Sequence, residues 1–227
     1  MNKNKITTTF FTSLLLILCS CTNQSGNKTL PFYGEKKAVS VVKNGTEVID
    51  SIYQTVGPFS FINQFNDTVS DKTLLGKVFL FTCFHTSFQT QLDTLLEKAL
   101  DTAHAEIGNS KDFHLISLTL DPTHDTPAVL KTYWDRKNIA GKNWSFLTGL
   151  TPDSLYNYIK YKYRLTAIRD TGSIKENGGI IHDDKIVLVD KQQRIRGYYK
   201  TTQTRQLIED AKTLLNEDTL SVSSSAN

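Results

Sequence analysis

Short apolar strand patterns alternate with helical patterns along the middle of the chain, and this alternation restricts the fold more than any other feature. A strand-like stretch at 77–82 precedes leucine and alanine residues that recur at helical spacing between Leu92 and Ala103. Another strand pattern follows at 113–120. Because strand, helix and strand follow one another in this order, the sequence predicts a β-α-β unit whose helix packs on a parallel pair of strands.

Two later helices have clear start signals. Thr126 and Thr151 each precede a proline, which is the pattern of an N-cap followed by the first helical residue. We expect these helices to end near Asn138 and Tyr163, with a strand at 144–147 between them.

The last part of the domain reads as a hairpin followed by a helix. Apolar stretches at 186–189 and 195–199 flank a polar turn, and an amphipathic helical pattern follows. The whole order predicts an α/β, thioredoxin-like fold with a mixed central sheet flanked by helices. Short strands within 47–69 would form an N-terminal strand extension.

The first residues have the order of a secretory signal: Lys3 and Lys5, an apolar core at 10–18, and then Leu18-Cys19-Ser20-Cys21. That ending resembles a bacterial lipobox, and the alternative is an ordinary signal peptide with a chance cysteine. We expect a lipoprotein signal peptide at 1–20, a lipid on Cys21, a polar tether at 21–29, the domain at 30–217 and a disordered tail at 218–227. The apolar core is too short to span a bilayer as a helix. The expected location is the bacterial cell envelope, lipid-anchored and facing the extracytoplasmic or periplasmic space.

Charge gives no sign of a nucleic-acid partner. The chain has 26 basic and 23 acidic residues, without a basic run. The membrane, reached through the lipid on Cys21, is the partner that the sequence itself predicts.

Cys83 would be the one thiol left in the mature protein, because cleavage removes Cys19 and lipidation consumes Cys21. We expect it at a strand-to-helix junction, where the helix dipole and free N–H groups stabilise a thiolate. The sequence therefore predicts sulfur chemistry at Cys83, either redox or metal binding.

Several motifs occur in a family-like order from Leu30 to about Tyr199. They are LPFYGE at 30–35, FSFINQ at 59–64, LTLDPTHDTP at 118–127, NWSFLTG at 143–149, IHDDKIVLVD at 181–190 and RIRGYY at 194–199. Together they resemble the SCO/SenC family, membrane-anchored copper proteins that assist cytochrome oxidase assembly. The resemblance implies a thioredoxin-like fold, copper as the bound metal and a copper subunit of cytochrome oxidase as the partner.

The resemblance also implies a site. Family members carry Cys-Pro-x-x-Cys-Pro after the first core strand and hold copper with both cysteines and a distant histidine. On that pattern Cys83 falls on the first cysteine, Ser87 on the second and His182 on the histidine. The CxxxC motif is thus CxxxS here, which implies a weakened copper site.

His85 is a candidate third ligand beside Cys83 and His182. A site with one sulfur and two nitrogens suits Cu(II) or zinc better than Cu(I), which prefers sulfur. No thioether can contribute, since Met1 is the one methionine. The alternatives are that His85 is a polar loop residue and that His182 is a core histidine.

Three functions remain open from the sequence. The first is a metallochaperone-like SCO protein rather than an enzyme, and the second is a monothiol redox protein that uses Cys83 without metal. The third is a binding module that keeps the fold without chemistry. We also expect Asp125 to satisfy free N–H groups at the start of the helix after Pro127, and Gly178 and Gly179 to form an unusual turn that presents His182.

Overall fold

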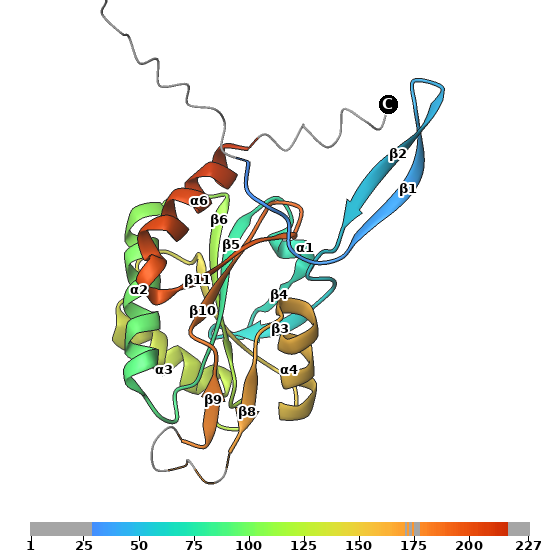
Figure 1. Ribbon diagram of the computed structural model, residues 1–227. Coiled ribbons are helices and arrows are strands. Elements are labelled where there is room, and N and C mark those ends of the chain that lie inside the picture. Colours follow the sequence, from blue (N-terminus) through green and yellow to red (C-terminus); the bar gives the residue numbers. More distant parts are fainter. Residues whose placement is uncertain (1–28, 171, 173, 175–177, 218–227) are drawn as a thin grey trace, which may run out of the picture.

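The computed structural model describes residues 29–170, 172, 174 and 178–217, and a mixed sheet forms the centre of this part (Figure 1). Its strand order is β11-β10-β5-β6-β7-β3-β4, with β5, β6 and β7 parallel and the outer strands antiparallel to their neighbours. The strands are β3 (Ser60–Asn63), β4 (Thr68–Ser70), β5 (Val78–Phe84), β6 (Phe113–Thr119), β7 (Trp144–Thr148), β10 (Lys185–Val189) and β11 (Ile195–Lys200). The mixed sheet that the sequence predicts is confirmed.

Helices cover both faces of the sheet. Helices α2, α3 and α6 lie on one side in Figure 1 and α4 lies on the other. Every residue of β5 is buried, and its side chains alternate between the two cores, so Leu80 packs toward α2 while Phe81 packs toward α4. The helices are α1 (Asp71–Leu74), α2 (Gln91–Ile107), α3 (Pro127–Lys137), α4 (Pro152–Tyr158) and α6 (Thr204–Asn216).

The two proline-marked helices begin where the sequence predicts. The Thr126 hydroxyl accepts a hydrogen bond from the Val129 N–H at 3.4 Å, and Pro127 is the first helical residue. Helix α4 begins at Pro152 and continues as a π-helical turn, η1 (Ile159–Tyr163), which explains why the helical pattern reaches Tyr163.

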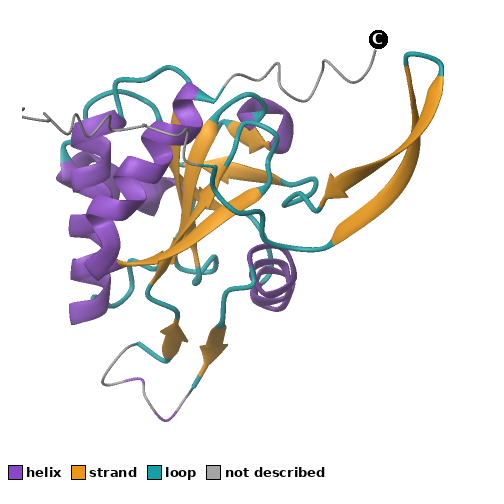
Figure 2. Ribbon diagram, turned by 45° about the horizontal axis from the view of Figure 1, so that its top comes forward, coloured by secondary structure: helices purple, strands orange, loops and turns teal. Residues whose placement is uncertain are grey.

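The predicted N-terminal strand extension at 47–69 is divided between two sheets: residues 46–53 belong to a separate hairpin, and β3 and β4 belong to the central sheet. Strands β1 (Lys36–Lys43) and β2 (Thr46–Tyr53) pair with each other and stand away from the body of the domain, as Figures 1 and 2 both show. Because β1 and β2 pair in a sheet of their own, the central sheet begins only at β3.

Arg196 joins the two ends of the described domain. Its guanidinium is almost fully buried and donates to the Leu30 carbonyl at 2.8 Å and the Pro31 carbonyl at 3.1 Å. The same group forms ion pairs with Asp190 and Glu217. A buried charge of this kind is tolerated because all its donors find acceptors.

The predicted signal peptide, the predicted lipidation site Cys21 and the predicted tail at 218–227 lie outside the described residues, as does the predicted tether apart from Thr29. Within the described part, no helix has both the length and the apolar character needed to cross a membrane.

Candidate functional site

The loop that joins β5 to α2 places His85 directly after the strand. Its side chain is 4% exposed, and Nδ1 lies 3.2 Å from the Ser87 hydroxyl oxygen. Nε2 is also buried and has no hydrogen-bond partner among the described residues. Burial lowers the pKa of His85 and so favours the neutral imidazole.

Asp93 lies in the first turn of α2, and its two carboxylate oxygens contact two different residues. Its Oδ2 accepts from the Thr90 N–H at 2.8 Å and the Thr90 hydroxyl at 2.6 Å, which forms a capping box at the helix start. Its Oδ1 lies 3.0 Å from His182 Nε2. Burial raises the pKa of the Asp93 carboxyl, but the hydrogen bonds from His182 and Thr90 outweigh burial and lower it overall.

His182 ends β9 (Ile180–His182), which pairs with β8 (Ala167–Arg169). Its Nδ1 donates to the Asp183 carbonyl at 2.9 Å, and its side chain is 4% exposed. Burial opposes a charge on the ring, yet the hydrogen bonds to Asp93 and the Asp183 carbonyl raise the pKa of His182 overall. These hydrogen bonds therefore favour the protonated form of His182 and the ionised form of Asp93.

The turn before β9 needs glycine, as the sequence predicts. Gly178 and Gly179 have φ values of +70° and +76°, which favour glycine. A Cβ atom on Gly178 would lie 2.7 Å from Phe88 Cβ and 3.7 Å from His85 Cε1. The glycine at 178 therefore lets the backbone approach the β5–α2 loop closely.

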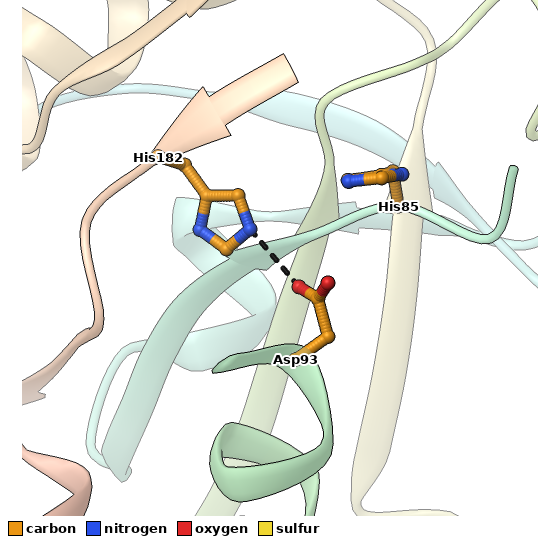
Figure 3. Close-up of side chains that lie close together, drawn as sticks. All are labelled: His85, Asp93 and His182. Atoms are coloured by element: carbon orange, nitrogen blue, oxygen red, sulfur yellow. Dashed lines mark hydrogen bonds and ion pairs between the residues drawn. The ribbon is translucent and has the colours of Figure 1, made fainter. Parts of the chain in front are cut away.

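These elements bring His85, Asp93 and His182 together, as Figure 3 shows. One ligand atom from each lies within 4.8 Å of the other two. The side chains come from the β5–α2 loop, α2 and β9, so the full tertiary fold is needed to assemble them.

Cys83 takes no part in this group. It lies inside β5, is 4% exposed and packs in the apolar cluster with Phe81 and Tyr163, on the face of the sheet that α4 covers. Burial raises the pKa of its thiol strongly, and the negative charge of Asp183 adds to the shift. The predicted helix N-terminus with a stabilised thiolate is therefore wrong at Cys83. The physical reason is that β5 continues to pair with β6 through Phe84, and α2 begins only at Gln91.

We expect Cys83 to be unreactive in the folded protein. When Cys19 and Cys21 are replaced by serine, Cys83 is the one thiol in the chain. Ellman's reagent should then modify Cys83 at least about 100-fold more slowly in buffer than in urea, because burial blocks access of the reagent and disfavours the thiolate. The exposed thiol introduced by Ser87→Cys in the same background serves as the control and should react at once. Equal rates for the two thiols would contradict the buried placement.

Asp125 differs from its predicted role. Thr126, not Asp125, caps α3. The Asp125 carboxylate is fully buried and accepts from the Thr86 N–H at 3.1 Å and from the hydroxyl groups of Thr86 and Thr119. It therefore anchors the loop that carries His85.

Sequence reasoning missed Asp93. The Thr90-x-x-Asp93 pattern before an apolar helical face is a capping-box signal, and it points to a helix start rather than to a site. Its second role depends on His182, which is 89 residues further along the chain.

Comparison with known proteins identifies relatives of this chain. A profile of the SCO1/SenC family matches residues 50–216. The SCO1 protein homolog of Bacillus subtilis (strain 168) is 25% identical over 171 residues, which cover 74% of this chain and 86% of the relative.

Two solved structures have the same fold. A SCO1/SenC family lipoprotein from Bacillus anthracis str. Ames aligns with a TM-score of 0.63 and 23% identity, over 70% of this chain and 93% of that one. The ScoI protein of Bradyrhizobium japonicum, solved with copper bound, aligns with a TM-score of 0.56 and 24% identity, over 70% of this chain and 98% of that one. The thioredoxin-like fold expected from the sequence is thereby confirmed. Because the family profile spans most of the domain, the chain belongs to the SCO1/SenC family.

Proposed function

We propose that this protein is a lipid-anchored SCO protein of the bacterial cell envelope that handles copper for cytochrome oxidase assembly. It would act as a metallochaperone rather than an enzyme, with the lipid on Cys21 holding it to the membrane and a copper subunit of cytochrome oxidase as its acceptor. The observation that carries the proposal is that His182, the expected family histidine, meets a second imidazole, His85, at one end of the sheet. The copper-bound ScoI relative and the lipoprotein relative support the two parts of the proposal.

The residues fit a Cu(I) site poorly. Cu(I) prefers thiolate or thioether sulfur, but Ser87 stands at the second motif position and Cys83 faces the opposite core. We infer that Cu(I) affinity is weakened relative to a site with two thiolates.

The buried thiol disfavours the monothiol redox alternative. Attack on a disulfide or a peroxide requires a thiolate that the other reactant can reach. Cys83 is buried in apolar surroundings that raise the pKa of its thiol. Burial therefore disfavours the thiolate and also keeps the other reactant away from the sulfur atom.

The proposal is tested in the bacterium that carries the gene, grown with limiting copper. Deletion should lower cytochrome oxidase activity, and the wild-type gene should restore it while His182→Ala should not. Cys21→Ala should move the protein out of the membrane fraction. Unchanged oxidase activity after deletion would contradict the proposed function, and full restoration by His182→Ala would favour the binding-module alternative.

A further inference from the structure

We propose that His85, Asp93 and His182 form a sulfur-free site that binds a divalent transition-metal cation, Cu(II) or Zn(II). This inference rests on the proposed function, metal handling by this domain, and specifies both the ligands and the class of ion. It adds Asp93 and His85 as ligands and leaves Cys83 out.

The first argument is that each of the three side chains has two polar atoms, and one of them is fixed by a neighbouring group, which leaves the second available as a ligand. Ser87 lies against His85 Nδ1, the Asp183 carbonyl accepts from His182 Nδ1, and Thr90 donates to Asp93 Oδ2. Two Nε2 atoms and one Oδ1 remain. His182 Nε2 and Asp93 Oδ1 lie 3.0 Å apart, and one ligand atom from each of the three residues lies within 4.8 Å of the other two. Outer partners that fix the orientation of histidine and carboxylate ligands in this way are typical of metal sites.

The second argument is the unpartnered nitrogen of His85. Its Nε2 is buried without a hydrogen bond among the described residues, although buried polar atoms are normally paired. His85 contributes one ligand atom to the converging group, and a Cβ atom on Gly178 would lie 3.7 Å from His85 Cε1, the ring carbon bonded to this nitrogen. A cation between the three atoms would give this nitrogen the partner that it lacks.

The third argument is distance. Ligand atoms around a tetrahedral zinc ion at about 2.0–2.2 Å lie about 3.4 Å from one another. The three atoms here lie within 4.8 Å of one another, so a contraction of at most about 1.4 Å by side-chain rotation brings them into a coordination sphere. When the ion enters, the proton on His182 Nε2 leaves to solvent and a bond from Nε2 to the metal replaces the hydrogen bond to Asp93.

The fourth argument is the chemistry of the donor set. Two imidazoles and a carboxylate suit Zn(II) and Cu(II), whereas sites with sulfur ligands favour Cu(I). Cys83 is the one cysteine in the described part of the chain, and it faces the other core. With three protein ligands, a fourth coordination position stays open, which suits an ion that has to be passed on.

The test uses the full-length lipidated protein, purified in detergent and freed of metal by chelation. Zn(II) and Cu(II) are titrated in competition with a chromophoric chelator, and Cu(I) in competition with bicinchoninate. We expect one equivalent of either divalent ion to bind and Cu(I) to be lost to the competitor. The Cu(II) form should show nitrogen hyperfine coupling in its electron paramagnetic resonance spectrum and no thiolate-to-copper charge-transfer absorption.

Variants separate this site from adventitious binding. His85→Asn, Asp93→Asn and His182→Asn should each lower the affinity for Zn(II) by more than the roughly 100-fold that loss of an outer partner can cost. Cys83→Ser and His104→Asn, a matched histidine on α2 outside the cluster, should leave the affinity within about twofold of the parent. Near-ultraviolet circular dichroism checks that each variant is folded. If a variant does not fold, the electron paramagnetic resonance spectrum of the wild-type Cu(II) form identifies the ligand atoms instead.

Three results would overturn the inference: retained affinity in Asp93→Asn, loss of affinity in Cys83→Ser, or the same weak binding in every variant. These outcomes are distinct from failure of the proposed function. Oxidase activity that is independent of the gene would remove the cellular role without changing the measured affinities, while a sulfur-dependent site would overturn this inference and leave the role in oxidase assembly intact.

Discussion

Replacing Arg196 by methionine should lower the free energy of unfolding by about 3 kcal/mol, because removal of one partner from a buried ion pair is strongly destabilising. The guanidinium pairs with Asp190 at 3.1 Å, and the side chains of both residues are nearly inaccessible. Asp190 keeps Arg194 as a partner at 2.8 Å, which places the expected loss at the low end of the range for such pairs. Urea denaturation of the full-length chain measures the change.

The same substitution should loosen the start of the domain. The carbonyl groups of Leu30 and Pro31 lose their donor, so limited proteolysis should cut near these residues faster than in the parent protein. Arg205→Met is the matched control, because Arg205 is 88% exposed and its pair with Glu209 should contribute less than about 0.5 kcal/mol. A loss below about 1 kcal/mol in Arg196→Met would show that the buried pair does not hold the two ends together.

Asp125→Ala should also destabilise the protein, by about 3 kcal/mol, since hydrogen bonds to a buried charged group contribute about 1.5–3 kcal/mol each and several are lost together. The Thr119 hydroxyl, which is fully buried, would lose its carboxylate acceptor. Because Thr86 would also lose its anchor, the adjacent His85 ring should move. Its imidazole resonances should shift in the nuclear magnetic resonance spectrum, and those of His104 should not.

Asp135→Ala serves as the control for Asp125→Ala. Asp135 is exposed and pairs with Lys131 on the surface of α3, where an ion pair contributes less than about 1 kcal/mol. If Asp125→Ala were as stable as this control and left the His85 resonances unchanged, Asp125 would not position the loop.

Much of the fold could be predicted from the sequence because local signals and the tertiary structure agree. Proline after threonine marks the start of α3 and of α4 in both. The apolar stretches of the last hairpin became β10 and β11. The register of the central strands could not be predicted, since it depends on neighbours that are distant in sequence.

The site was only partly predictable. His182 was identified through the family-like motif around it, and His85 through its place in the loop after β5. Asp93 was missed because its local role as a capping residue fully explains its position. Its contact with His182 exists only once β9 folds back beside the start of α2.

The sequence by itself determined the succession of strands and helices, because hydrophobic periodicity and capping residues act over a few neighbouring positions. It also determined the family, through motifs spread along the domain. Tertiary structure alone decided the role of Cys83. Pairing of β5 with β6 extends the strand through Phe84, and since successive side chains of a strand point to opposite faces, the thiol enters the apolar core beside Tyr163. The two histidines instead meet a carboxylate whose partner lies far along the chain, which no local pattern encodes.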